Sequence, residues 1–447
     1  MQRPAKPWTP VRFRLQPPIM LIKYLLKSSL FFLKSLFFKQ SFDVIFSYDY
    51  KLKNGAKQTP ALLLPFIEFC KKKGYRYIIF EDVDLRKIRK DKELSLNSIP
   101  MTSLTLLESI LKRLYKLFSW DHITNRKTHI NQSYEDGSIF EVKRGKEILM
   151  ISKISKFFFR NISCPNVITL VSNRSYLWRQ CFPNARIYDY QHGVIFNGDA
   201  NYLNSGRPPE YRIKENLITL VYSNKIKNLL KDNDLSDYYS DKNLIVLGKK
   251  KNKHQLNKTD NQNLSMLFSC QNASDGNQND LNYYYSLLIN FFNDSEDLIN
   301  ELSCSLILRN HPRAIASENP ILKFPFFKES TNNDIYQDLH ASDLHLTMNS
   351  SSVFEASELG IPTIFLELDD SSVFFPTLAS KKLYLEQFDY PFEKFFVSSA
   401  SDLRIAIDFY LSQDINYLKQ RLVKWHDMMI EEISEAKVSN LLKKDNK

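Results

Sequence analysis

Short apolar segments alternate with helical ones along most of this 447-residue chain. In the first half of the chain, the segments with the composition of buried strands are 42–48, 75–81, 166–172, 185–190 and 217–223, and a last one begins at residue 243. Helical segments such as 60–74 and 224–232 separate them. Because parallel strands need long crossover connections and are covered on both faces, this alternation predicts a mainly parallel, doubly wound α/β sheet.

The alternation stops near the middle of the chain and then starts again. Residues 250–263 are polar, rich in lysine and without periodicity, as is typical of a linker. The strand-like segments after it are 264–270, 304–310, 344–350 and 362–367. We therefore predict two Rossmann-like domains, residues 41–249 and 264–433, with a cleft between the carboxyl ends of their strands.

The positive charge is concentrated at one end of the chain. The formal net charge is +11, and residues 1–59 hold eleven Lys or Arg against two Asp. The rest of the chain is close to neutral and has no nucleic-acid-binding motif, so we do not expect nucleic acid as a partner. Residues 1–18, which are rich in proline, are expected to be a disordered tail, and residues 434–447 a polar tail.

Residues 19–40 have the pattern of an amphipathic helix. Lys23, Lys27 and Lys34 fall on one side of it, and Leu, Ile and Phe cover most of the remaining surface. The lysines interrupt the segment too often for a spanning helix or a secretory signal peptide. We favour an interfacial helix on the anionic cytoplasmic leaflet, which predicts a cytoplasmic protein peripheral to the inner face of the membrane. The alternative is a core helix with a lysine edge.

Neither a metal nor a bound cofactor is expected. The five cysteines are scattered without CxxC or zinc-ligand spacing, which indicates a reducing cytosol. With ten glycines in all, the chain has no GxGxxG and no P-loop motif. The carboxylates in segments 81–84 and 369–370 are interpreted as solvated loops.

Polar residues follow two strands of the predicted second domain. His311 and Arg313, after the strand 304–310, can donate hydrogen bonds to phosphate oxygens. Ser350, Ser351 and Ser352 come at the end of the strand segment 344–350 and begin a helix, where hydroxyl and N–H groups can bind an anion. The plainer interpretations are a turn for the first segment and a helix cap for the second.

Further candidates lie beside these segments. Glu355 is one helical turn beyond Ser351, and its carboxylate can accept hydrogen bonds from two ribose hydroxyls. Ser269, Gln271 and Asn272, at the end of the strand 264–270, can close over the phosphate or the base. The shared position at strand ends predicts a nucleotide site.

The first domain has its own polar segment, Gln191-His192-Gly193, directly after the strand 185–190. An imidazole titrates near neutrality, so His192 can take up a proton, while Gly193 lets the backbone pass close to a ligand. The alternative is a half-buried, hydrogen-bonded histidine with no chemical role.

Four short motifs resemble those of known enzymes. His311-Pro312, followed by Ser351-Ser352, resembles bacterial GT-B glycosyltransferases of capsule and lipopolysaccharide synthesis, above all the Kdo- and sialic-acid-transferring families that use CMP-sugars. The Gln-His-Gly segment resembles capsule Kdo-transferase-like proteins and teichoic-acid polyol-phosphate polymerases, where His-Gly carries the catalytic base. Glu135-Asp136-Gly137 resembles the acidic motif that supplies the base in several sialyltransferases, although the residues before it are polar rather than strand-like.

The resemblance implies a metal-independent GT-B glycosyltransferase. It would move a sugar from a nucleotide-activated donor, preferably a CMP-sugar, to a surface-polysaccharide or lipid-linked glycan acceptor. His192 is the implied base, where it takes the proton of an acceptor hydroxyl, and Asp189, Gln191 and Gly193 are expected on the acceptor side of the cleft. Asp136 is the rival base, and in that case His192 would bind the donor phosphate. A polyol-phosphate transferase and a sugar-nucleotide epimerase of the same fold are the alternatives, and the epimerase should need no membrane helix.

Overall fold

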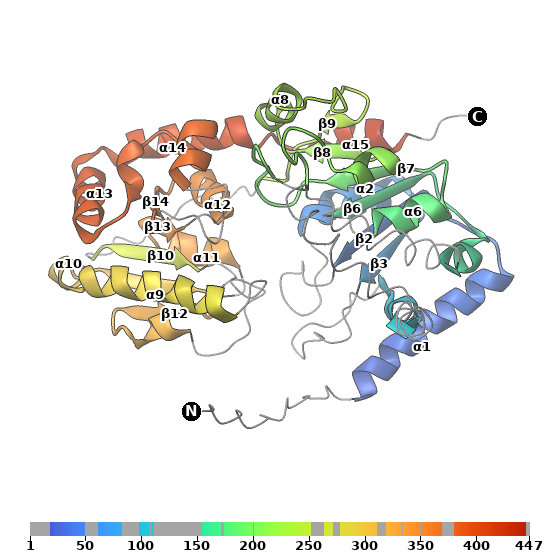
Figure 1. Ribbon diagram of the computed structural model, residues 1–447, viewed down its shortest axis with the longest axis horizontal. Helices are drawn as coiled ribbons and strands as arrows, with labels where there is room; N and C mark the ends of the chain where they lie inside the picture. Colours follow the sequence, from blue (N-terminus) through green and yellow to red (C-terminus); the bar gives the residue numbers. More distant parts are fainter. Residues whose placement is uncertain are drawn as a thin grey trace, which may run out of the picture.

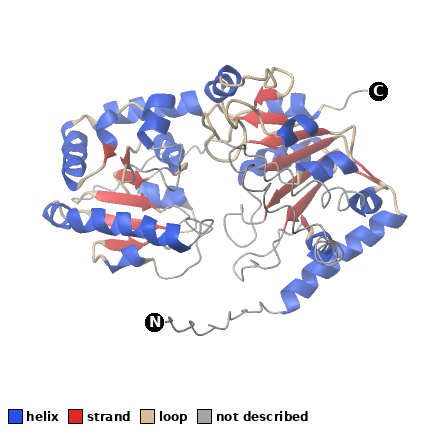
Figure 2. Ribbon diagram, viewed as in Figure 1, coloured by secondary structure: helices blue, strands red, loops and turns tan. Residues whose placement is uncertain are grey.

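The computed structural model describes residues 18–49, 61–82, 98–107, 109–110, 154–170, 174–199, 201–251, 263–270, 278–310, 319–332, 334–348, 350–368 and 380–443. Two large parallel sheets lie side by side, each covered by helices (Figures 1 and 2). The α/β class and the doubly wound architecture that the alternating segments predict are confirmed.

The first sheet has seven parallel strands in the order β4-β3-β2-β6-β7-β8-β9. They are β2 (Val44–Asp49), β3 (Tyr77–Asp82), β4 (Ser98–Pro100), β6 (Asn166–Leu170), β7 (Arg186–Tyr190), β8 (Ile218–Val221) and β9 (Leu244–Val246). Among the described residues before the linker, the α-helices are α1 (Pro18–Phe37), α2 (Leu64–Lys73), α6 (Ser175–Cys181), α7 (Glu210–Lys214) and α8 (Asn224–Asp232). The direction in which strands are added reverses between β2 and β6.

The second sheet has six parallel strands in the order β12-β11-β10-β13-β14-β15. They are β10 (Ser265–Ser269), β11 (Ser305–Arg309), β12 (Phe327–Glu329), β13 (Leu344–Thr347), β14 (Thr363–Leu366) and β15 (Phe396–Val397). Its helices are α9 (Gln278–Asp294), α10 (Glu296–Glu301), α11 (Ile335–His340), α12 (Ser352–Glu358), α13 (Ala400–Ser412) and α14 (Ile415–Met429). Here the reversal lies between β10 and β13.

Several short elements were not predicted from the sequence. The edge strands β4, β12 and β15 have three, three and two residues, too few for a periodic pattern to be recognised. The same is true of the two-stranded sheet formed by β1 (Gln40–Ser41) and β5 (Ile162–Ser163). Residues 103–118 have the sequence pattern of a further helix, and the structure describes only 103–107, 109 and 110 of them.

The last helix, α15 (Glu435–Leu442), returns to the first sheet and packs against α2. Val438 and Leu441 are buried, and the Leu441 carbonyl accepts a hydrogen bond from the Tyr188 hydroxyl of β7 at 3.0 Å. The polar tail expected at residues 434–447 is therefore wrong over this helix. Its few apolar residues are spaced to share one helical face, which an average over a polar segment conceals.

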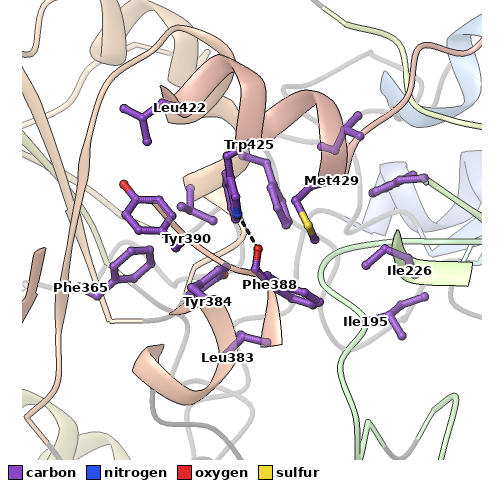
Figure 3. Close-up of a cluster of buried hydrophobic side chains, with 14 of the residues drawn as sticks. Ile195, Ile226, Phe365, Leu383, Tyr384, Phe388, Tyr390, Leu422, Trp425 and Met429 are labelled. Carbon is purple, nitrogen blue, oxygen red and sulfur yellow. Dashed lines mark hydrogen bonds between the residues drawn. The ribbon is translucent and has the colours of Figure 1, made fainter. Parts of the chain in front are cut away.

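One apolar core extends through both halves of the molecule. Figure 3 shows Trp425 of α14 packed in this core, where its indole N–H donates to the Phe388 carbonyl at 2.7 Å. Ile195 and Ile226 of the first half lie on the side of this cluster near Met429. Because side chains from both halves are buried together, apolar burial holds the two sheets in one arrangement.

Helix α1 runs along the outside of the first half and buries one of its faces (Figure 1). Phe32 lies in a second apolar core with Phe80 and Phe159, and the Ser103 amide donates to Ser28 Oγ at 3.1 Å. The core contact expected under the alternative interpretation of this segment is therefore present. It accounts for only one face of the helix.

The opposite face of α1 is apolar and exposed. Ile22, Leu26, Leu30, Leu33 and Phe37 are 52–77% exposed and recur at helical spacing. Within the part of the chain that the structure describes, no helix is long and apolar enough to cross a membrane.

A buried ion pair connects β7 to α7. Asp189 and Arg212 have side-chain exposures of 0% and 1%, and the guanidinium also donates to Thr219 Oγ1 at 3.1 Å and lies 4.2 Å from the Tyr202 ring centre. The expected place of Asp189 on the acceptor side must be corrected, because its carboxylate is enclosed with this cation.

Arg212→Met should destabilise the protein by about 3–5 kcal/mol, because the Asp189 carboxylate would remain buried without its cation. Urea unfolding at neutral pH measures this loss. Arg404→Met is the control, since Arg404 pairs with Glu301 on the surface and its loss should leave the unfolding midpoint almost unchanged. Equal effects of the two substitutions would contradict a special role for the buried pair.

Candidate active site

The carboxyl ends of β10 and β13 meet where the strand order of the second sheet reverses. Ser269 is the last residue of β10, Thr347 is the last of β13, and Ser350 to Ser352 follow. Open α/β sheets bind ligands at such reversal points, outside the carboxyl ends of the strands. The strand-end positions expected for Ser269 and the serine run are the ones observed.

His345, within β13, connects these segments. Its Nδ1 lies 3.0 Å from Thr363 Oγ1, and its Nε2 lies 2.9 Å from Ser269 Oγ and 3.1 Å from Ser352 Oγ. The imidazole is fully buried. One ring nitrogen therefore holds the hydroxyls of two serines that come from different strand ends.

Burial lowers the pKa of His345 to about 3, so the ring is neutral under physiological conditions. A neutral imidazole has one N–H donor and one acceptor nitrogen. With the proton on Nε2, the ring donates to the serine oxygens, and both serine hydroxyls keep their protons to donate elsewhere. Phosphate oxygens only accept hydrogen bonds, so this tautomer is the one that suits an anion site.

The turn formed by Ser350, Ser351 and Ser352, called the serine turn below, is held by hydrogen bonds other than a helix cap. Ser351 occupies the N-cap position of α12, but its side chain makes no capping hydrogen bond. The Ser350 amide donates to Thr347 Oγ1 at 3.2 Å, the Ser352 amide donates to Ser350 Oγ at 3.3 Å, and the Tyr384 hydroxyl donates to the Ser350 carbonyl at 3.0 Å. The plainer interpretation as a cap therefore does not account for the exposed Ser351.

The Gln191-His192-Gly193 segment directly follows β7. The buried Gln191 side chain accepts from the Tyr222 amide at 2.8 Å and donates to the Gly193 carbonyl at 2.9 Å. The Gln191 carbonyl accepts from the Tyr222 hydroxyl at 2.8 Å. Gln191, expected on the acceptor side, is therefore enclosed and holds the turn, while His192 is exposed and Gly193 takes a left-handed φ of +84°.

A lysine contacts both halves of the site. Lys249 Nζ lies 2.8 Å from Glu355 Oε1 and 5.9 Å from the centre of the Tyr222 ring. Tyr222 in turn binds Gln191, so a chain of contacts leads from the turn that carries His192 to α12 in the second half. The contacts through Lys249 and Tyr222 thus join the His192 turn of the first half to α12 of the second half.

Several expected site residues lie outside the described part of the chain: Asp136, Gln271, Asn272, His311 and Arg313. Asn310, just before His311, donates to Glu329 Oε1 at 2.7 Å and accepts from Asn319 at 2.8 Å. Among the described residues, no group of three or more His, Cys, Asp or Glu side chains is placed to hold a metal ion.

His345 and Lys249 were not among the candidates from the sequence. His345 lies in a strand segment in which apolar and polar residues alternate. All four residues of this strand are buried, and a polar residue in a buried strand is the signal by which His345 could have been found. Lys249 stands at the start of a lysine run that has the composition of a linker. Composition cannot distinguish the lysine that contacts Glu355 from its neighbours.

The neutral state of His345 makes stability depend on pH. Its pKa in the folded protein is below that of an unfolded histidine, so stability should fall as pH is lowered from about 6.5 toward 3. From pH 7 to pH 5 this histidine should account for roughly 2 kcal/mol of that loss. In His345→Gln, urea unfolding at the two pH values should show a loss smaller by that amount; an unchanged loss would contradict the assignment.

Comparison with known proteins supports the fold. No family model matches the sequence, and neither does any curated protein. A variant of the wall teichoic acid polymerase TagF aligns over 95% of this chain and 93% of its own, with 12% identity and a TM-score of 0.52. The calicheamicin glycosyltransferase CalG4 covers 90% of this chain and 97% of its own, with 10% identity and a TM-score of 0.49.

A UDP-GlcNAc 2-epimerase from Methanocaldococcus jannaschii aligns over 90% of this chain and 99% of its own, with 12% identity and a TM-score of 0.49. Identities this low concern the fold and not the reaction. The chain has the GT-B fold, with two Rossmann-like domains.

Proposed function

We propose that the protein is a metal-independent glycosyltransferase that moves a sugar from a nucleotide-activated donor, preferably a CMP-sugar, to a surface-polysaccharide or lipid-linked glycan acceptor. The observation that carries the proposal is the pair of serine hydroxyls, Ser269 and Ser352, that His345 brings together at the reversal point of the second sheet. Glu355, on the same helix as Ser352, forms an ion pair with Lys249, which follows β9 of the first half.

In this proposal the donor nucleotide binds to the second domain. Ser269 and the serine turn donate to its phosphate, with His311 and Arg313 as further donors, and Glu355 accepts from the ribose hydroxyls. The site would thus stabilise the negative charge that develops on the phosphate as the bond to the sugar breaks. Gln271 and Asn272 would lie against the phosphate or the base.

His192 is the proposed general base of the first domain. It is exposed at the end of β7 on a turn that Gln191 fixes. An imidazole there can take the proton of the acceptor hydroxyl as its oxygen bonds to the anomeric carbon of the sugar. Asp136 remains the rival base, in which case His192 would bind the donor phosphate.

Two alternatives use the same fold. A polyol-phosphate transferase is favoured by the likeness to a wall teichoic acid polymerase, because that likeness covers nearly the whole chain. A sugar-nucleotide epimerase is disfavoured by the exposed apolar stripe on α1, which a soluble epimerase does not need.

We further propose that the stripe of Ile22, Leu26, Leu30, Leu33 and Phe37 binds the cytoplasmic face of the membrane. Lys23 and Lys34 are exposed on the same helix and can contact anionic headgroups. This arrangement would keep the enzyme at the surface where lipid-linked acceptors are found.

His192→Ala should lower turnover by roughly 10²–10⁴-fold and barely change nucleotide affinity, because the base acts only on the acceptor. His192→Gln should not restore activity, since an amide cannot take up a proton. His340→Ala is the control, and initial rates with nucleotide titrations are the measurements. A loss of nucleotide affinity would instead make His192 a phosphate ligand and Asp136 the base. Wild-type turnover in His192→Ala would show that His192 has no chemical role.

Leu26→Glu with Leu30→Glu should weaken binding to phosphatidylglycerol-containing vesicles by more than about tenfold, because each leucine loses its burial in the bilayer. Vesicle sedimentation measures this. Leu411→Glu, at an exposed apolar position on α13, is the control. Point substitutions are preferable to deleting α1, because Phe32 belongs to the core. Unchanged vesicle binding of the double variant would contradict the membrane contact.

A further inference from the structure

The two chain connections between the halves of the molecule run side by side at Lys249. The Lys249 amide donates to the Glu431 carbonyl at 2.9 Å, and the Ile433 amide donates to the Lys249 carbonyl at 3.2 Å. Before it, Gly248 has a φ of +94°, and a Cβ there would lie 2.6 Å from the Glu431 oxygen. The backbone of Lys249 is therefore fixed where the chain leaves the first sheet and where it returns.

From this fixed backbone the lysine side chain extends to α12. Lys249 Nζ lies 2.8 Å from Glu355 Oε1, and the two side chains are 22% and 20% exposed. The lysine also passes the Tyr222 ring, with its ammonium 5.9 Å from the ring centre. An ion pair this shielded from water holds its geometry better than one between fully exposed side chains.

We propose that Lys249 is a positioning residue of the nucleotide site: it holds the Glu355 carboxylate in the orientation that accepts both ribose hydroxyls. The proposal rests on the function proposed above. A carboxylate has about four acceptor positions, and Lys249 uses one of them, so enough remain for two hydroxyls. A carboxylate that is already oriented loses less conformational entropy when the nucleotide binds.

The same lysine makes ribose recognition depend on both domains. Glu355 belongs to the second half, whereas Lys249 follows β9 and lies against Tyr222, which binds Gln191 under the His192 turn. A nucleotide whose ribose is bound by Glu355 would therefore lie in a site that the first half helps to shape.

The test compares CMP with its 2′,3′-dideoxy analogue by isothermal titration. Wild-type protein should prefer CMP, and Glu355→Gln should remove the preference. Lys249→Met should weaken CMP binding by about 3- to 10-fold, because Glu355 loses its orientation, and leave the affinity for the dideoxy analogue unchanged. Lys249→Arg should stay close to wild type, since a guanidinium also donates to a carboxylate.

The neighbouring Lys250 provides a matched control, because it pairs with Glu68 on the surface and Lys250→Met should not change either affinity. If Lys249→Met keeps the full preference for CMP while Glu355→Gln loses it, the role of Lys249 is overturned and the ribose site stands. If Glu355→Gln also keeps the preference, the nucleotide site itself is misassigned. Because the hydrogen bonds that join Lys249 to Glu431 and Ile433 use its backbone, we expect the variants to fold; Lys249→Gln is a second variant for the same comparison.

Discussion

All strands of a parallel sheet end at one edge, and each connection must cross back before the next strand can begin. Where the order of strands reverses, the connections leave toward opposite faces, and the two strand ends at the reversal are left open to a ligand. In this protein that constraint brings Ser269 at the end of β10 next to Ser350, Ser351 and Ser352 after β13. The proposed function depends on this one junction.

Buried polar side chains hold the functional turns in place through hydrogen bonds. His345 holds two serine hydroxyls in the second half, and Gln191 holds the His192 turn in the first. A buried polar group is costly unless it is hydrogen-bonded, and a fully satisfied one fixes its neighbours in a single arrangement. Gln191 thus gives the exposed His192 a defined position, and His345 does the same for the buried Ser269 and Ser352 hydroxyls, as a catalytic or binding group requires.

The fold could be predicted from the sequence because alternating strands and helices leave a periodic signal. The same signal located the strand ends at which Ser350 and Gln191 stand. The same reasoning placed Asp189 and Gln191 on the acceptor side of the cleft, because a sequence does not show which polar side chains are enclosed. Asp189 is paired with Arg212, 23 positions along the chain. Lys249 and Glu355 are 106 positions apart, and no local pattern reports such a contact.

The most direct measurement is calorimetric titration of the full-length protein with CMP, UDP, GDP and a CDP-polyol, repeated with Ser352→Ala. One of these nucleotides should bind selectively, CMP in the favoured case, and its affinity should fall by about tenfold or more in the variant, the cost of a lost charge-assisted hydrogen bond. Selective binding of the CDP-polyol would instead support the polyol-phosphate transferase. Binding of none of them, or an affinity that Ser352→Ala leaves unchanged, would contradict a nucleotide site at the reversal point of the second sheet.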